Sequence, residues 1–327
     1  MDSIANLGVS KELVEFNKNL KHPILKSERE ALSFDGLYLY YQLHGMLCSI
    51  NNDFNGAYNY SEKILISLNK HPHIIEERPD IYWIVLHNLI HAQNKLGKYN
   101  ESLININKFN SITTNSESLK SKIFYSFCYF ELSIFINLGK FDKGVVFIEK
   151  IKDQVQKNLI AFPSVKYEHF LFISFAYIYF GVGNFVTAKK YLYKVINETL
   201  DGYWINTQGF ARILFILIYF ELGEKDFLPY LIKSTYKFVN KKKKLHSLDA
   251  ILLSFLRNMF SDTKKGSNHN NDFKKLKLQI QEFMKNSKQV STIVNFDLIS
   301  WIESKIQKRP FAEIVQGKQK IKYIPGI

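Results

Sequence analysis

Cysteine and proline are scarce in this sequence. The two cysteines, Cys48 and Cys128, lie 80 residues apart, and neither belongs to a CxxC pair. A disulfide framework is therefore not expected, and because both cysteines lie in apolar stretches we expect buried free thiols. Only seven prolines accompany 46% hydrophobic and 15% aromatic residues, a composition that predicts an ordered protein.

A membrane span and a secretory signal are also missing. The best candidate span, "FLFISFAYIYFGVGNFVT" at 170–187, is uncharged but is interrupted by Gly181, Gly183 and Asn184. A spanning helix needs about 20 predominantly apolar residues, so we expect a buried helix followed by a turn. The first residues, "MDSIANLGVSKELVEF", lack a basic segment followed by an apolar one. We therefore expect a cytoplasmic protein without membrane insertion.

Recognisable catalytic motifs are absent as well. The sequence contains no glycine-rich phosphate loop and no GxSxG, and its carboxylates are too scattered to suggest an acid–base pair. His87 and His91 have the helical spacing of two zinc ligands, but Asn88 stands where the zinc-protease pattern requires Glu. We therefore expect no enzymatic activity, no cofactor and no metal site.

The positive charge of the chain is concentrated near its end. Residues 1–224 hold 23 Lys and Arg against 22 Asp and Glu, whereas residues 225–327 hold 21 against 8. The densest run is Lys241, Lys242, Lys243 and Lys244. This run could contact phosphate or an acidic protein surface, but we favour the interpretation that it is a solvated link between two helices. Recognisable nucleic-acid modules are lacking, so nucleic acid is a possible but not a favoured partner.

One short phrase recurs along the chain: "LGKYNESL" at 96–103, "LGKFDKGV" at 138–145 and "VGNFVTAK" at 182–189. The glycines of these three copies and of a fourth, less similar copy are separated by 42, 44 and 40 residues. An Asn stands 45 residues before the first of these glycines, at the position that Gly has in the other copies. We call these five positions the turn residues: Asn52, Gly97, Gly139, Gly183 and Gly223. Gly and Asn tolerate the left-handed conformation that ends a helix, so each is predicted to end one helix before a second begins.

The residues around each turn residue support this interpretation. Two positions later the first four copies have an aromatic residue, and five positions later they have a small one that would let two helices approach closely. The small residues are Ala57, Ser102, Gly144 and Ala188, with Leu228 in the fifth copy. Apolar helices are predicted before each turn residue, at 31–51, 80–96, 119–138, 166–182 and 207–222.

The repeating unit resembles the tetratricopeptide repeat, whose signature has Leu-Gly near the end of the first helix and then an aromatic residue and Ala in the second. The matching residues include Leu96-Gly97-Tyr99, Leu138-Gly139-Phe141 and Val182-Gly183-Phe185-Ala188. The period of 40–45 residues is longer than the usual 34 or so, and the fifth copy has Lys225 where the aromatic is expected. The resemblance implies an all-α solenoid of about five antiparallel helical hairpins, and a longer type of helical repeat is the structural alternative.

This reading divides the chain into four parts. Residues 1–29 form an N-terminal segment and residues 30–244 the repeat array. Residues 245–316 form a helical cap, because terminal repeats of a solenoid need an atypical closing element. The cap includes a helix with Phe273, Leu276, Ile280 and Phe283 on one stripe, and residues 317–327 form a basic tail.

In proteins of the resembled family, the first helices line a concave face that usually holds an extended peptide or a helix. Aligning the copies on their turn residues places nine residues on that face. They are His91, Asn94, Lys98, Asn137, Lys140, Lys143, Tyr177, Asn184 and Glu221. Asn and Lys suit the backbone amides and carboxylates of a peptide. The carboxylate-clamp pattern for chaperone tails is not reproduced.

The sequence therefore favours a non-enzymatic scaffold that binds a protein or peptide. A peptide-sensing regulator built on similar repeats is the first alternative, but only about 30 residues precede the first repeat, too few for an N-terminal helix-turn-helix domain. Binding of nucleic acid or of an acidic partner through the basic C-terminal third is the second alternative. The identity of the partner does not follow from these residues.

Overall fold

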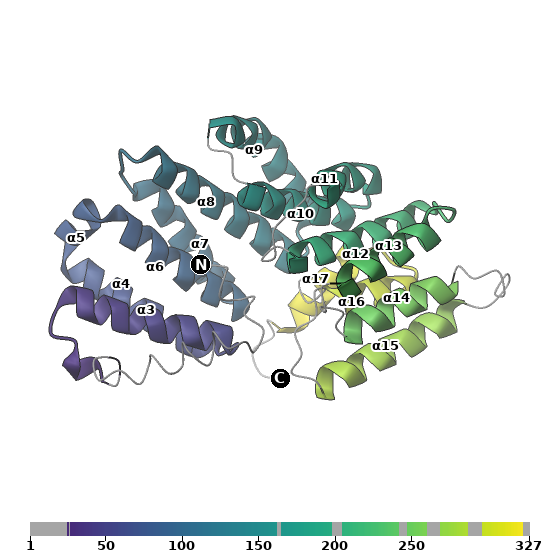
Figure 1. Ribbon diagram of the computed structural model, residues 1–327, viewed down its shortest axis with the longest axis horizontal. Coiled ribbons are helices and arrows are strands. Elements are labelled where there is room, and N and C mark those ends of the chain that lie inside the picture. Colours follow the sequence, from purple (N-terminus) through teal and green to yellow (C-terminus); the bar gives the residue numbers. More distant parts are fainter. Residues whose placement is uncertain are drawn as a thin grey trace. The chain divides into compact units, whose positions relative to one another are not determined.

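A computed structural model describes residue 25 and residues 27–161, 165–197, 205–241, 247–259, 269–286 and 296–322. Every regular element in these ranges is a helix (Figure 1). The prediction of an all-α protein is confirmed for this part of the chain. The predicted N-terminal segment 1–29 lies almost wholly outside it.

The helices up to residue 137 are α3 (Phe34–Ile50), α4 (Phe54–Lys70), α5 (Pro72–Glu77), α6 (Pro79–Lys95), α7 (Tyr99–Asn107) and α8 (Glu117–Asn137). Two short 3₁₀ helices, η2 (Glu28–Glu30) and η3 (Lys108–Ser111), precede α3 and α8. The helices after residue 140 are α9 (Phe141–Ala161), α10 (Val165–Gly181), α11 (Phe185–Asn197), α12 (Ile205–Leu222), α13 (Leu228–Lys241), α14 (Ser247–Met259), α15 (His269–Asn286), α16 (Leu298–Gln307) and α17 (Phe311–Lys322).

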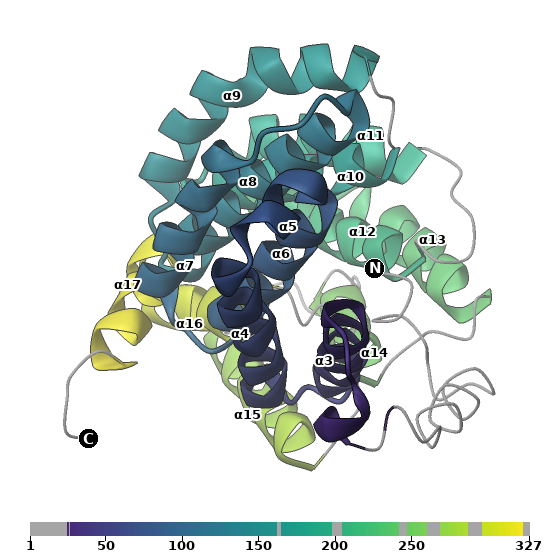
Figure 2. The same cartoon turned by 90° about the vertical axis from the view of Figure 1, so that its left-hand side faces the viewer.

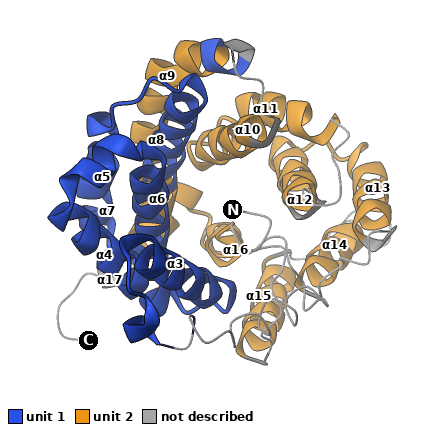
Figure 3. Cartoon of the chain, turned by 60° about the vertical axis from the view of Figure 1, so that its left-hand side comes forward, with its two compact units in different colours: residues 1–134, 157–163 blue, residues 135–156, 164–327 orange. Residues whose placement is uncertain are grey.

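The helices gather into two compact units (Figure 3). Unit 1 comprises residues 1–134 and 157–163, and unit 2 comprises residues 135–156 and 164–327, so α8 and α9 contribute to both. Within unit 1, α3 packs on α4, α4 on α6 and α6 on α7. Within unit 2, each helix from α10 to α17 packs on the next one along the chain. The helix pairs named here are therefore formed by helices that lie close together in sequence.

The five turn residues adopt the conformation that the sequence predicts. Asn52 has φ 60°, and the four glycines have φ between 66° and 77°. In every copy the backbone N–H after the turn residue donates to the carbonyl five residues earlier, at 2.8–3.1 Å. This bond satisfies one of the carbonyls that the end of an α-helix leaves free. The first helices predicted before these turns are observed as α3, α6, α8, α10 and α12.

A sixth turn of the same kind occurs where the phrase is absent. Lys308, which ends α16, has φ 52°, and the N–H of Arg309 donates to the carbonyl of Ser304 at 3.1 Å. The hairpin of α16 and α17 is thus built like the earlier ones, although a lysine takes the left-handed position. The predicted basic tail 317–327 is in part helical, because α17 continues to Lys322.

The small residues that follow the turns are all buried, together with Leu228 in the fifth copy. Gly144 shows why size matters, since a Cβ atom there would lie 2.7 Å from Cδ1 of Ile178. A larger residue at this position would therefore force Ile178 of α10 or the helix itself to shift. The prediction of close helix approach is confirmed.

Candidate binding face

The turn residues give a common register for comparing the first helices. We call the residues 13, 9, 6 and 2 positions before a turn residue the first-helix stripe, because this spacing puts them on one face of a helix. The stripe of α3 is Leu39, Leu43, Met46 and Ile50, and that of α6 is Ile84, Asn88, His91 and Lys95. The stripe of α10 is Phe170, Ser174, Tyr177 and Gly181, and that of α12 is Phe210, Leu214, Leu217 and Glu221.

In unit 2 the end of the chain itself contacts one residue in each of the stripes of α10 and α12, namely Tyr177 and Glu221. We call residues 296–318 the C-terminal segment. The backbone N–H of Asp297 donates to Oη of Tyr177 at 2.9 Å. At α12, the indole N–H of Trp301 donates to Oε1 of Glu221 at 2.6 Å, and Nζ of Lys305 lies 2.5 Å from the same carboxylate.

Aromatic side chains fill the space beside these polar contacts. The ring of Phe296 lies 5.0 Å from that of Tyr177 and 5.6 Å from that of Phe311, measured between centroids. Phe311 in turn lies 5.6 Å from Phe141 and from Phe180. At these distances the rings interact favourably beyond the burial of their area.

The C-terminal segment is part of the core of unit 2. Trp301 and Ile302 are fully buried, and Phe296 and Phe311 are almost so. From α17, Nε2 of Gln316 donates to the carbonyl of Gly139 at 2.8 Å. On α16, Glu303 pairs with Lys277 of α15 and with Lys318 of α17. Burial raises the pKa of Glu303, but the two lysines outweigh it and leave the pKa below its ordinary value.

Two of the predicted site residues thus hold a polypeptide that belongs to their own chain. Tyr177 is buried, which raises the pKa of its hydroxyl, and Glu221 is joined to both Trp301 and Lys305. Whether an external partner also reaches them stays a prediction.

The other four predicted residues of unit 2 lie near two of the turn residues, Gly139 and Gly183. Asn184 is exposed, and its Oδ1 accepts from the N–H of Thr187 at 3.1 Å, so it caps α11. Lys140 and Lys143 are exposed, and Asn137 is half-buried at the end of α8. Binding of a partner at these four positions stays a prediction.

The three predicted residues of unit 1 lie around the end of α6. The ring of His91 is 6.2 Å from that of Phe54. Nζ of Lys98 lies 3.9 Å from the ring of Tyr58 and 3.6 Å from the Glu101 carboxylate. Asn94 is buried, and neither atom of its amide has a hydrogen-bond partner among the described residues.

The stripes of unit 1 differ from those of unit 2 in exposure. Leu39 is 54% exposed and Lys95 is exposed, while the remaining stripe residues of α3 and α6 are half-buried. The two helices are joined by the Asn88 amide, which donates to Oε1 of Gln42 at 3.3 Å. In α10 and α12, by contrast, all but Phe170 and Glu221 are buried. Most residues at these positions are therefore buried in unit 2, whereas in unit 1 they are half-buried or exposed.

The predicted histidine pair and cysteines have ordinary surroundings. Nδ1 of His87 lies 3.1 Å from Oγ of Ser126, which also accepts from the indole of Trp83 at 3.0 Å. Among the described residues, no group of three or more His, Cys, Asp and Glu could hold a metal ion. Both thiols are free. Cys128 is buried and Cys48 half-buried, and burial raises the pKa of each.

The lysine run lies largely outside the described residues. Lys241 is the last residue of α13, the structure does not describe its side chain, and Lys242, Lys243 and Lys244 fall in the undescribed stretch 242–246. Its role stays a prediction.

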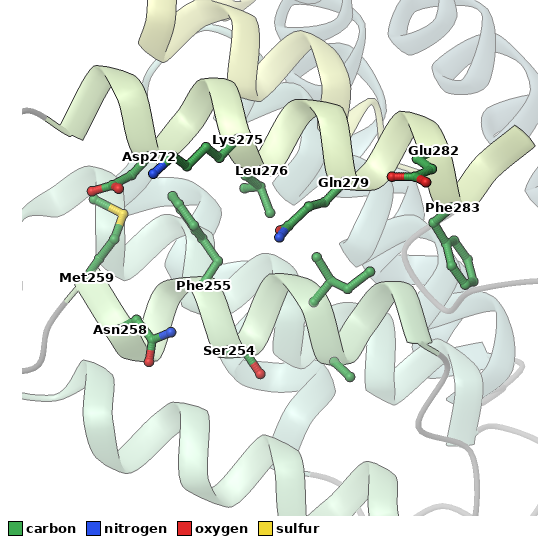
Figure 4. Close-up of a pocket in the computed structure, with 12 residues that line it drawn as sticks. Ser254, Phe255, Asn258, Met259, Asp272, Lys275, Leu276, Gln279, Glu282 and Phe283 are labelled. Atoms are coloured by element: carbon green, nitrogen blue, oxygen red, sulfur yellow. The ribbon is translucent and has the colours of Figure 1, made fainter.

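A groove of about 760 Å³ lies between α14 and α15, where the sequence indicated no site. Side chains of both helices point into it (Figure 4). Apolar side chains such as Phe255, Leu276 and Phe283 form part of its wall, and Asp272, Lys275 and Glu282 are among its charged residues. Charges of both signs alternate with apolar groups, so the groove does not select one ligand chemistry.

No protein-family model, no curated protein and no solved structure matches the chain. In the part that the structure describes, helices that could cross a bilayer are lacking. The resemblance to tetratricopeptide repeats therefore rests on the turn residues and on the residues around them.

Proposed function

We propose that the protein is a non-enzymatic scaffold, built as a tetratricopeptide-like solenoid, that binds a helical segment of a partner protein on the first-helix stripes of α3 and α6. We call these two stripes the unit 1 face. We expect the protein to act in the cytoplasm.

One observation supports this proposal above the others: the same register in unit 2 already holds a polypeptide. The C-terminal segment meets the stripes of α10 and α12 with a backbone N–H, an indole and an ammonium group. In a solenoid, equivalent positions of successive hairpins have similar geometry, so we expect a segment of similar shape to bind the unit 1 face.

The chemistry of the unit 1 face indicates what such a segment must offer. The α3 stripe is entirely apolar, with Leu39 more than half exposed. The α6 stripe adds Asn88, His91 and Lys95, which provide hydrogen bonds and a positive charge. An amphipathic helix with apolar residues toward α3 and acidic or amide side chains toward α6 would satisfy both.

The proposal is tested with charge changes on and off the unit 1 face. Proteins that copurify with the full chain at high salt are compared between Leu39→Glu and Ile66→Glu. Both residues are apolar and about equally exposed, at 54% and 51%, but Ile66 lies on the second helix α4. A partner of the unit 1 face is lost from Leu39→Glu and kept by Ile66→Glu.

A second pair of variants tests the polar side. Lys95→Glu lies on the α6 stripe, whereas Lys70→Glu, also exposed, lies at the end of α4. A peptide from the captured partner should bind at least tenfold more weakly to the first variant and about equally to the second and to wild type. Equal effects of both members in each pair would refute a role for this face.

A further inference from the structure

The exposed aromatic side chains of the described residues all belong to α11, to α13 or to the turn before α13, in unit 2. They are Tyr193 of α11, Tyr230 and Tyr236 of α13, and Phe227 in the turn before α13. Their exposed fractions are 60%, 72%, 43% and 61% respectively. The other Phe, Tyr and Trp residues whose burial is described are buried or half-buried. Aromatic rings left in water on so few elements indicate an interaction surface.

Lysines accompany these tyrosines. Lys190 and Lys194 on α11, and Lys233 and Lys237 on α13, are all exposed. Neither helix contains an Asp or Glu, although Asp226 just before α13 is exposed, and Glu198 and Asp201 follow α11 in a stretch that the structure does not describe. The two helices themselves therefore carry only positive charge.

The second helix of the preceding hairpin, α9, provides a contrast. It carries exposed Lys143 and Lys150, but also exposed Asp142, Glu149 and Asp153. The absence of acids is thus a property of α11 and α13 rather than of second helices in general.

Contacts through α12 hold α11 and α13 in one arrangement, and both helices pack on α12 (Figures 1 and 2). Near their first turns, Nζ of Lys189 lies 2.7 Å from the carboxylate of Glu224. Near their ends, Arg212 of α12 donates to the carbonyl of Ile196 at 3.1 Å and lies 4.5 Å from the ring of Phe238. These contacts therefore hold the two helices in a fixed arrangement on α12, and we call their exposed lysines and tyrosines the Lys/Tyr face.

We propose that the Lys/Tyr face binds single-stranded nucleic acid. Lysines attract the phosphates and release counterions on binding. Exposed tyrosine rings provide platforms on which unpaired bases stack, and stacking tolerates any base sequence. An acidic protein surface would satisfy the lysines but would not require the rings of Tyr193 and Tyr230. The aromatic residues therefore favour nucleic acid as the partner.

The charge of the face is tested by fluorescence anisotropy with the full chain and a labelled 20-nucleotide oligothymidine. Wild type should bind it, with an affinity that falls steeply as salt is raised, because phosphate contacts displace counterions. Lys190→Glu/Lys237→Glu should weaken binding at least tenfold. The matched control Lys143→Glu/Lys150→Glu on α9 should stay within about twofold of wild type. No binding by wild type at low salt, or equal losses in both double variants, would overturn the proposal.

Variants of the tyrosines distinguish binding of nucleic acid from binding of an acidic protein. Tyr193→Ala/Tyr230→Ala should weaken oligothymidine binding about tenfold, because stacking is lost. Tyr193→Phe/Tyr230→Phe keeps both rings and should bind within about twofold of wild type. If the alanine variant binds as wild type does, and polyglutamate of matched charge binds as tightly as the oligonucleotide, the face recognises acidic protein and the nucleic-acid proposal is wrong. Leu39→Glu, on the unit 1 face, should change none of these affinities.

Discussion

Replacing each of the four glycine turn residues by Ala tests whether the C-terminal segment packs against one of them, Gly139. Each glycine has φ between 66° and 77°, so replacement by Ala costs the same left-handed strain, about 1–2 kcal/mol. A Cβ atom at Gly97, Gly183 or Gly223 would meet nothing within 4 Å. These three variants should therefore lose about 1–2 kcal/mol of unfolding free energy, which is the cost of the left-handed strain alone.

Gly139 differs because α17 lies against it. A Cβ atom there would be 3.0 Å from side-chain atoms of Val315 and Gln316, and 3.1 Å from the backbone nitrogen of Gln316. A backbone atom cannot swing aside as the end of a side chain can, so α17 must shift. Overpacking of this kind costs about 1–3 kcal/mol, which brings the expected total to about 2–5 kcal/mol.

The assay is urea unfolding followed by far-UV circular dichroism, with Gly183→Ala and Gly223→Ala as controls in the same unit. Gly139→Ala should be less stable than both controls by about 1–3 kcal/mol. Adding Val315→Ala removes one of the crowding atoms and should recover part of the difference. Equal stability of the three glycine variants would refute the contact between α17 and the third turn.

Three further predictions concern stability and thiol chemistry. Trp301→Ala should cost about 3–5 kcal/mol in unfolding free energy, because it empties a fully buried site, whereas an effect below about 1 kcal/mol would contradict that burial. The ion pairs of Glu303 lower its pKa, so they stabilise the fold above the ordinary carboxyl pKa and lose effect as pH falls through the folded value. Glu303→Gln should therefore be less stable than wild type near neutral pH, and urea unfolding should show the difference vanishing in acid; a difference that persists there would refute the pairing. Burial raises the pKa of both thiols, so a thiol reagent followed by mass spectrometry should modify half-buried Cys48 slowly and buried Cys128 only on unfolding; rapid labelling of Cys128 in the native protein would contradict its burial.

The hairpins could be predicted from the sequence because their signals are local. Gly ends a helix because it adopts the left-handed backbone conformation without steric cost. The aromatic and small residues that follow it are three positions apart, so they lie within one helical turn of each other. The five observed turns and the five first helices therefore match their predictions. The sixth turn was missed because Lys308 adopts the left-handed conformation without the residue type that favours it.

The position at which the C-terminal segment packs on unit 2 could not be predicted, because its contacts join residues far apart in sequence. Tyr177 meets Asp297 across 120 residues, and Gly139 meets Gln316 across 177. The alignment of the copies selected Tyr177 and Glu221 as positions that face a polypeptide, but nothing local indicates that the polypeptide is the end of the same chain.

The Lys/Tyr face, by contrast, has a signal that the sequence contains. In α11 the buried residues Ala188, Leu192 and Val195 lie on one side, and Lys190 and Tyr193 fall on the opposite side by helical spacing. A search for aromatic residues on predicted polar helix faces would have found it.

A double-mutant cycle between Trp301 and Glu221 tests most directly whether the C-terminal segment occupies the first-helix stripes of unit 2. Trp301→Phe, Glu221→Gln and the double variant are compared with wild type by urea unfolding. Residues in direct contact couple by about 0.5–3 kcal/mol, and we predict a coupling in this range from the 2.6 Å hydrogen bond between them. Strictly additive effects of the two substitutions would show that the two side chains do not interact, and would contradict the contact between α16 and α12 on which the proposed function depends.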